Sequence, residues 1–235
     1  MSMGDLGSDI RTRYEPNVFN SVRKLLPPGS LIFDVGAYDG ITSDILATIV
    51  GPENVVIVEP GEMDWATIWA YWNAHGHGAP RATYAGFLND SDRPGLDPRS
   101  VVHVGKFPPE ADQSIVAQAE EGLNFRLLSD REKYPEVMAR PWLKLDTVTS
   151  IVGSPAGVVM DVEGAELLVL RGAEETLRSN RPFVWAEIHP KLMHDFFMMS
   201  DFNLHVLMQE LGYQETLLGS KINEEHWLFV PEEHS

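Results

Sequence analysis

A glycine-containing segment with acidic residues on both sides follows the first apolar run of the chain. The segment D-V-G-A-Y-D-G (34–40) comes directly after residues 31–33, and a helix is expected from about Thr42. Glycine lets the backbone approach a ligand closely, and the start of a helix offers N–H groups that no carbonyl of the helix can accept. The sequence therefore predicts a ligand-binding bend at this position.

The glycine spacing and the acidic side chains indicate the class of ligand. Gly36 and Gly40 form G-x-x-x-G, whereas dinucleotide-binding proteins use G-x-G-x-x-G, and a pyrophosphate would be poorly matched to Asp34 and Asp39. A nucleoside without phosphate and with positive charge fits better, and S-adenosylmethionine is the ligand we expect. Its binding residues in this segment are predicted to be Asp34, Gly36, Ala37, Tyr38, Gly40 and Ser43.

Polar residues that follow the next two predicted strands extend this site. Glu59 ends an apolar run at 55–58, where its carboxylate can accept hydrogen bonds from both hydroxyls of a ribose. Taken alone, Glu59 can equally be a solvated acid at a strand end. Asn89 and Asp90, just past a strand predicted at 82–88, are candidates for binding the adenine edge, with a simple turn as the alternative.

A second group of reactive side chains lies near two later strand ends. Asp161, in M-D-V-E-G-A-E (160–166), is predicted to be the last residue of its strand. Glu187 and His189 are two residues apart, so they face the same side of the neighbouring strand. The trio can hold a Mg²⁺-type ion, or His189 can act as a general base; a structural histidine is the alternative. Glu166 is better explained as a helix-capping residue.

The sequence H-G-H-G (75–78) resembles a metal-binding loop, because it carries two histidines two residues apart. A metal centre needs at least a third ligand, and none follows nearby in the sequence. We therefore predict that His75 and His77 belong to a surface turn.

Alternating strands and helices predict an α/β fold that positions both groups at one edge of a sheet. We expect a Rossmann-like, mostly parallel seven-stranded sheet with helices on both faces and a C-terminal antiparallel hairpin. Residues 1–30 are predicted to be a helical lead-in, 31–235 a single domain, and 89–141 an irregular insertion or lid. Expected strands are 31–35, 55–60, 82–88, 101–104, 157–161 and 183–189, expected helices are 17–26, 42–50, 62–74, 114–121, 165–179 and 192–211, and the hairpin is 212–218 with 226–230.

The composition narrows the choice of partners. Asp and Glu number 35 against 18 Lys and Arg, so the formal net charge of −17 disfavours nucleic acid and anionic membranes and favours a small or neutral acceptor such as a sugar. Cysteine is absent, which excludes thiolate nucleophiles, and no apolar run reaches the roughly 18 residues of a membrane span. We expect a cytoplasmic protein. Trp65, Trp69, Trp72 and 196–199 can form a sugar platform, a homodimer face or core packing.

Five segments together resemble the FkbM family of methyltransferases. They are FDVGAYDGITSDIL (33–46), VVIVEPG (55–61), LKLDTV (143–148), VVMDVEGAELLVLRGAEETL (158–177) and RPFVWAEIHP (181–190). The resemblance implies a class I methyltransferase fold with S-adenosylmethionine as methyl donor, and O-methylation of sugars or natural products, with a mannoside or rhamnoside as the suggested acceptor. It also implies that Asp34, Gly36, Gly40 and Glu59 bind the donor, with Asp161 beside it.

Two other functions remain open for the same fold. A nicotinamide-dependent oxidoreductase would bind NADH, which the glycine spacing disfavours. A non-catalytic nucleoside-binding subunit would bind the donor without transferring its methyl group. For a methyltransferase, the enzyme must align acceptor oxygen, methyl carbon and sulfur, and the hydroxyl must lose its proton to His189 or be polarised by a divalent ion.

Overall fold

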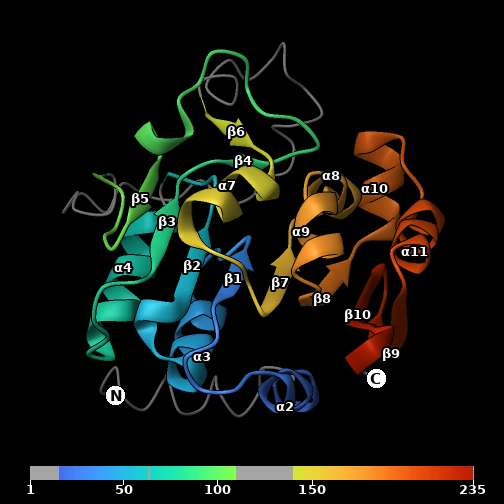
Figure 1. Cartoon of the computed structure of the whole chain (residues 1–235), viewed down its shortest axis with the longest axis horizontal. Coiled ribbons are helices and arrows are strands. Elements are labelled where there is room, and N and C mark those ends of the chain that lie inside the picture. Colours follow the sequence, from blue (N-terminus) through green and yellow to red (C-terminus); the bar gives the residue numbers. More distant parts are fainter. Residues whose placement is uncertain (1–15, 63, 110–139, 235) are drawn as a thin grey trace.

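The central element of the structure is an eight-stranded sheet with the order β5-β3-β2-β1-β7-β8-β10-β9 (Figure 1). The structure is a computed structural model that describes residues 16–62, 64–109 and 140–234. The strands of this sheet are β1 (Ile32–Val35), β2 (Val55–Val58), β3 (Ala82–Tyr84), β5 (Val102–Val104), β7 (Gly157–Asp161), β8 (Phe183–Ile188), β9 (Tyr213–Lys221) and β10 (Glu224–Pro231).

The five strands in the order β3-β2-β1-β7-β8 are parallel to one another, whereas β5, β10 and β9 pair antiparallel. β10 pairs with β8 and with β9, so the C-terminal hairpin completes one side of the sheet. This arrangement confirms the predicted mainly parallel sheet with an antiparallel hairpin. β5 corresponds to the strand expected at 101–104, and its antiparallel pairing with β3 at the other edge extends the sheet from the seven strands expected to eight.

Helices cover both faces of the sheet (Figure 1). Because successive strand residues point to opposite faces, Ile32 and Ile57 pack with the helices of one face, whereas Phe33 and Val56 pack with those of the other. The first face carries α2 (Pro16–Leu25), α3 (Ile41–Val50) and α4 (Asp64–Ala74), and the second carries α7 (Leu145–Val152), α8 (Glu166–Arg171), α9 (Glu174–Ser179), α10 (Pro190–Phe197) and α11 (Asp201–Glu210).

Several predicted elements are interrupted. The strand expected at 82–88 is divided into β3 and β4 (Phe87–Leu88), and β4 pairs with β6 (Trp142–Leu143) in a separate two-stranded sheet. The helix expected at 165–179 divides into α8 and α9 around Gly172, where a Cβ would overlap the carbonyl oxygen of Asn89. The helix expected at 114–121 lies outside the described residues, and α7 is a helix that the sequence analysis did not predict.

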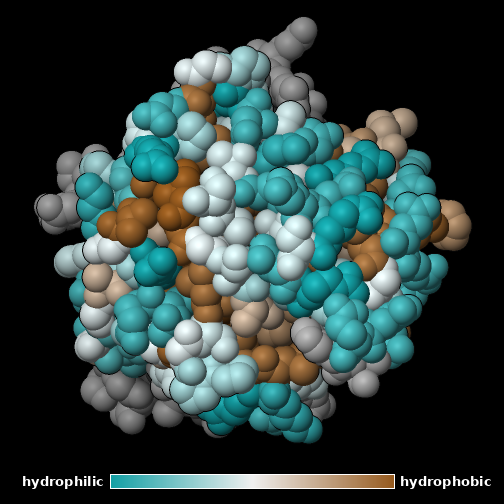
Figure 2. Space-filling model, viewed as in Figure 1, coloured by the Kyte–Doolittle hydropathy of each residue, from teal (hydrophilic) through white to brown (hydrophobic). Residues whose placement is uncertain are grey.

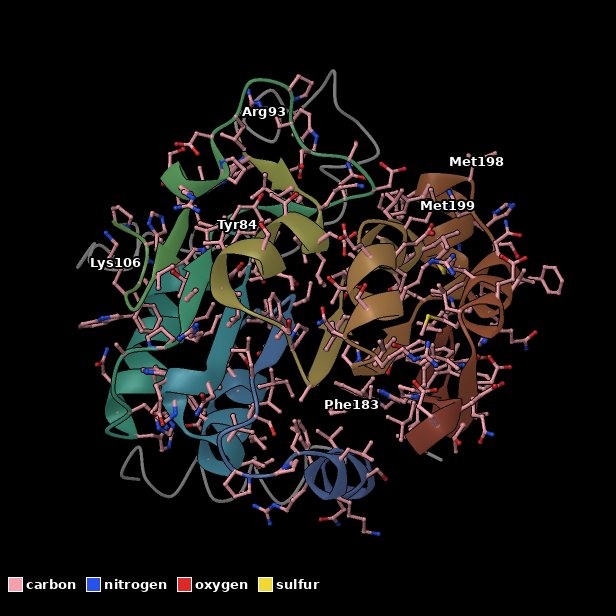
Figure 3. All side chains as sticks on the ribbon, in the orientation of Figure 1. Tyr84, Arg93, Lys106, Phe183, Met198 and Met199 are labelled. Atoms are coloured by element: carbon pink, nitrogen blue, oxygen red, sulfur yellow. The ribbon has the colours of Figure 1, made fainter. Side chains whose placement is uncertain are left out.

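The helix expected at 192–211 also divides, into α10 and α11. Met198 takes a left-handed conformation with φ 55°, and the hydroxyl of Ser200 then accepts the N–H of Phe202 to cap α11. Met198 lies at the outer end of α10, next to Met199, and its side chain is exposed (Figure 3). Trp65 and Trp72 of α4 are buried in the core, so they serve core packing, which was one of the predicted alternatives. Trp69 is the exposed tryptophan of this helix.

The surface seen in Figure 2 is largely hydrophilic, with apolar atoms in separate patches between polar side chains. Within the described residues, none of the helices combines the length and the apolar character needed to span a membrane.

Candidate donor site and acidic cluster

The predicted ligand-binding bend connects β1 to α3. Gly36, Tyr38 and Gly40 have φ angles of 83°, 48° and 81°, so the backbone turns through left-handed conformations before α3 begins at Ile41. A Cβ on residue 36 would overlap the carbonyl oxygen of Asp161, which means that only glycine fits there. The bend therefore packs the end of β1 directly against the end of β7.

Glu59, which follows β2, holds this bend from the other side. Its Oε2 accepts the N–H of Tyr38 at 2.9 Å, and its Oε1 accepts the N–H of Gly61 at 2.6 Å. On the first face of the sheet, the hydroxyl of Ser43 in α3 donates to Oδ2 of Asp34. Asp34 and Glu59 are both buried, and thus the structure brings the predicted acidic residues together around the bend.

Both buried carboxyl groups have raised pKa values. Burial, together with the charge of Asp39, raises the pKa of Asp34 to about 7 despite the hydrogen bond from Ser43. Burial and the neighbouring Asp64 raise the pKa of Glu59 to about 7. Among the described residues, neither group forms an ion pair with a lysine or arginine. A ligand with positive charge would therefore be stabilised beside them.

The remaining predicted donor residues have different surroundings. Ala37 and Ser43 are buried, whereas Tyr38 is 66% exposed at the outside of the bend. Asn89 and Asp90 follow β4, where Asn89 donates its N–H to the carbonyl of Leu143 in the small sheet. The structure shows no hydrogen bond from either residue to Asp34 or Glu59 within the described chain, so the two polar segments are not directly joined.

The second predicted group converges on the ring of His189. Asp161 and Glu187 are direct neighbours in the register of β7 and β8. Nε2 of His189 lies 3.9 Å from Oδ1 of Asp161, 3.7 Å from Oε1 of Glu187 and 3.7 Å from Oε2 of Glu163. The structure thus brings the predicted trio together and adds Glu163, which the sequence analysis had not assigned to the site.

The acidic cluster consists of Asp161, Glu163, Glu187 and His189, and its positive charge comes from His189 and from Lys221, which pairs with the nearby Glu224 at 2.8 Å. Burial raises the pKa of Asp161 to about 7, and Oδ1 of Asp161 is buried without a hydrogen-bond partner among the described residues. Burial and the charge of Asp161 raise the pKa of Glu187. Burial alone would lower the pKa of His189, but a hydrogen bond to Glu166 and the surrounding acidic groups outweigh this effect and raise it. The His189 ring therefore holds its proton more firmly than a free imidazole, and the carboxyl groups around it suit the cluster to a cation.

Two overlapping groups of residues could hold a metal ion at this point. One consists of Asp161, Glu163 and His189, and the other of Glu187, His189 and Glu224, with the ligand atoms of each group within 4.8 Å of one another. Glu224 begins β10 and was not predicted. The pairing of β10 with β8 carries it to this site.

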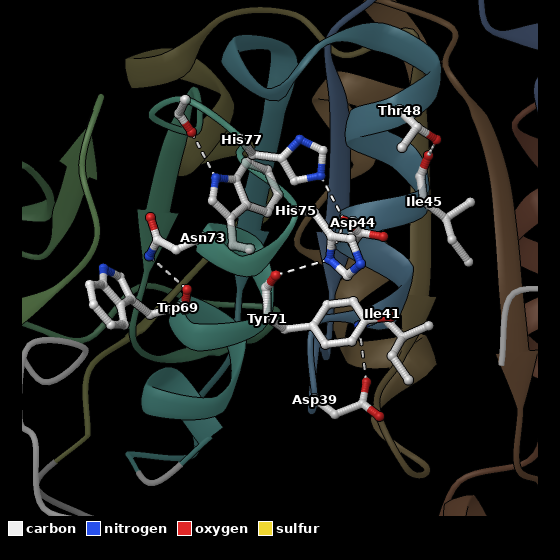
Figure 4. Close-up of polar contacts among 12 residues, drawn as sticks. Asp39, Ile41, Asp44, Ile45, Thr48, Trp69, Tyr71, Asn73, His75 and His77 are labelled. Atoms are coloured by element: carbon white, nitrogen blue, oxygen red, sulfur yellow. Dashed lines mark hydrogen bonds and ion pairs between the residues drawn. The ribbon is translucent and has the colours of Figure 1, made fainter. Parts of the chain in front are cut away.

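His75 and His77 are not simply part of a surface turn. Nε2 of His77 lies 2.7 Å, and Nδ1 of His75 3.2 Å, from Oδ1 of Asp44, a fully buried residue of α3 (Figure 4). His75 also contacts the carbonyl of Tyr71 at 3.0 Å. The turn after α4 is therefore fastened to α3 by a carboxyl group that lies 31 residues earlier than His75 in the sequence.

The order of the strands and the site at their carboxyl ends define a Rossmann-like methyltransferase fold. The methyltransferase FkbM domain model matches residues 34–215, more than half of the chain. The chain belongs to the FkbM methyltransferase family. This confirms the relationship that the five sequence segments indicated.

One solved structure supports the same fold. Methyltransferase FkbM from Methylobacillus flagellatus KT is similar with a TM-score of 0.52 and 15% identity, over 86% of this chain and 43% of that chain. The present chain thus spans less than half the length of that protein. A SAM-dependent methyltransferase from Aquifex aeolicus matches with a TM-score of 0.44 and 13% identity, over 95% of this chain and 97% of that chain. A search of curated proteins found no match.

Proposed function

We propose that the protein is an S-adenosylmethionine-dependent O-methyltransferase. The acceptor we infer is a hydroxyl of a saccharide, such as a mannoside or rhamnoside, or of a related natural product. The observation that carries the proposal is the pair of buried carboxyl groups, Asp34 and Glu59, at a glycine bend that lacks a compensating lysine or arginine within the described chain. Membership of the FkbM family supports it.

The residues around the bend fit the donor. Glu59 would accept hydrogen bonds from the ribose hydroxyls, because each of its oxygens has a further lone pair beyond the backbone contact it already makes. Asp34 supplies negative charge, and Gly36 leaves the backbone free of a side chain. The other residues proposed to bind the donor are Ala37, Tyr38, Gly40, Ser43, Asn89, Asp90 and Asp161. When bound, the donor supplies a methyl group on a positively charged sulfur.

The acidic cluster is the proposed acceptor side. A donor held at the bend would supply its methyl group to the acceptor oxygen and would be left as a neutral thioether. The hydroxyl proton must leave, and Nε2 of His189 would accept it when the ring is in its neutral form, which the raised pKa of His189 favours only at alkaline pH. His189 and its neighbours therefore carry the acid–base chemistry in this proposal.

A divalent ion such as Mg²⁺ is the second way to activate the hydroxyl. Asp161, Glu187 and His189 would hold it, with Glu163 or Glu224 completing one of the two possible groups. The two roles of His189 exclude each other, because Nδ1 already contacts Glu166 and only Nε2 remains for a proton or an ion. If His189 is the base, carboxyl groups alone must hold the ion.

Calorimetry with S-adenosylhomocysteine and with NADH tests the donor assignment. We expect the first to bind and the second not to bind, and the opposite result would overturn the proposal in favour of an oxidoreductase. Turnover on a panel of neutral saccharides then separates an enzyme from a non-catalytic binding subunit. Parallel assays with EDTA and with His189→Ala test the activation step, and full activity under both conditions would refute it.

A further inference from the structure

Glu166 is the first residue of α8, and its side chain is completely buried. The side chain folds back toward the preceding turn, where Oε1 accepts the N–H of Gly164 at 2.9 Å. The same oxygen lies 3.1 Å from Nδ1 of His189. Glu166 thus links the end of β7 to the end of β8, two segments that are 23 residues apart in the sequence.

The local backbone brings these two side chains together. Glu163 and Gly164 have positive φ angles of 51° and 100°, which turn the chain back before α8 begins. A Cβ on residue 164 would lie 2.9 Å from atoms of Leu192 and Met193, so the start of α10 rests directly on this glycine. His189 is the N-cap residue of α10 and is held at the same place.

The hydrogen bonds indicate which ring nitrogen carries the proton. Oε1 of Glu166 has two lone pairs, and one of them accepts the N–H of Gly164. The other can accept a hydrogen bond from Nδ1 of His189, which then carries the proton of the ring. In the neutral ring, the lone pair is then on Nε2, the nitrogen that faces Asp161, Glu163 and Glu187. The contact therefore orients the ring and favours the tautomer with the proton on Nδ1.

Helix capping alone does not account for Glu166. Its second oxygen, Oε2, is buried without a hydrogen-bond partner among the described residues, which is an unfavourable position for a residue needed only to cap a helix. Glu174 is also the first residue of a helix, α9, yet its side chain is 43% exposed. Burial against His189 distinguishes Glu166 from such a first-turn acid.

We propose that Glu166 is a positioning residue, which holds the His189 ring so that Nε2 presents its lone pair to the acceptor side of the site. The inference rests on the proposed function and deepens it, since it explains how His189 is prepared to take a proton or bind an ion. Carboxyl groups that orient a functional histidine in this way generally contribute 10- to 100-fold to affinity or activity.

Glu166→Gln is the decisive variant, because the amide oxygen of glutamine can still accept the N–H of Gly164 but no longer offers Nδ1 of His189 a charge-assisted hydrogen bond. A role in capping alone therefore predicts wild-type behaviour. Our proposal predicts that kcat falls roughly 10- to 100-fold, with the affinity for S-adenosylhomocysteine changed less than about twofold, and that the ¹⁵N shifts of the His189 ring move. Glu174→Gln is the matched control and should change none of these quantities.

Wild-type ring shifts provide a test that requires no variant to fold. Above the raised pKa of His189, where the ring is neutral, we expect the proton to be on Nδ1 and none on Nε2. A neutral ring protonated on Nε2 would overturn the proposal, as would unchanged kcat and ring shifts in folded Glu166→Gln. If His189→Ala retains full activity while Glu166→Gln still moves the ring shifts, the catalytic role of His189 fails but the positioning contact stands. The two proposals can thus be rejected separately.

Discussion

The carbonyl oxygen of Asp161 occupies the space that a side chain on residue 36 would need. The two residues meet because β1 and β7 are paired in register, with Val35 opposite Met160. The glycine bend between β1 and α3 is consequently in direct backbone contact with the acidic cluster at the end of β7. A change at residue 36 must therefore affect both.

We expect Gly36→Ala to abolish measurable binding of S-adenosylhomocysteine and to lower the free energy of unfolding by roughly 2–4 kcal/mol, from steric overlap and a strained φ. Gly29→Ala is the matched control, because Gly29 also has a positive φ of 84° but no atom within 4 Å of the added Cβ. Gly29→Ala should lower the free energy of unfolding by about 1 kcal/mol and leave the binding of S-adenosylhomocysteine unchanged. Calorimetry and urea unfolding measure both effects, and equal behaviour of the two variants would contradict the geometry.

The affinity for S-adenosylmethionine should depend on pH. Asp34 and Glu59 have pKa values of about 7 in the free protein, so below pH 7 they must release protons to meet a cationic ligand. Affinity should therefore fall as the pH drops from 8 to 5.5, by up to about tenfold per pH unit for each proton released. Glu59→Gln should weaken binding and make this dependence shallower, whereas the exposed Glu62→Gln should do neither. A flat profile in the wild type would refute the electrostatic argument.

Asp34→Asn should lower the affinity for the positively charged donor and raise the free energy of unfolding of the ligand-free protein. The pKa of Asp34 is raised from 3.8 to about 7, so the folded protein keeps a proton that the unfolded chain releases between these values. Its contribution to stability is fully present below about pH 4 and is lost as the pH rises through 7. At pH 8, the uncharged variant should be more stable than the ligand-free wild type by roughly 1–3 kcal/mol.

Urea unfolding at pH 5 and pH 8 measures this difference, which should shrink at the lower pH. Asp90→Asn changes an exposed carboxyl group and serves as the control. A variant that is less stable than the wild type at pH 8 would show that the charge of Asp34 is already compensated in the free protein.

Asp44→Ala should destabilise the protein by about 2–4 kcal/mol, because the turn after α4 would lose the buried partner of His75 and His77. Asp195→Ala removes an exposed i,i+4 partner of Lys191 and should leave the free energy of unfolding almost unchanged. Thermal and urea unfolding compare the two variants. Equal losses would mean that the contact in Figure 4 contributes little.

Binding of Mn²⁺, as a probe for Mg²⁺, should distinguish the two candidate metal groups. We expect His189→Ala to weaken it in either case, since both groups include His189. A loss with Glu224→Gln but not with Glu163→Gln locates the ion between β8 and β10, and the reverse result locates it beside Asp161. Wild-type protein that binds no Mn²⁺ by calorimetry would remove the ion from the proposed mechanism.

The sequence was sufficient to predict where the strand ends converge. Apolar runs at β1, β2, β7 and β8 identify the inner strands, and parallel pairing brings their carboxyl ends to one edge, so Asp161, Glu187 and His189 could be grouped in advance. β8 ends at Ile188, one residue before the predicted strand end, yet the two-residue spacing of Glu187 and His189 correctly predicted that they lie together.

Contacts that depend on tertiary packing could not be predicted in this way. The partner of Glu166 depends on where α10 begins, and that of His77 lies 33 residues earlier in α3. Glu224 required the strand order, in which β10 lies next to β8. The break between α10 and α11 occurs at Met198, a residue that gives no glycine or proline signal for the left-handed conformation it adopts.

Because no space is left around Gly164, the turn after β7 and the start of α10 must be compatible with each other in every sequence that keeps this fold. Any larger residue there would push the first turn of α10 outward and would carry the imidazole of His189 away with it. Among relatives, glycine at 164, glutamate at 166 and histidine at 189 should therefore be inherited or replaced as a set, whatever acceptor each protein methylates.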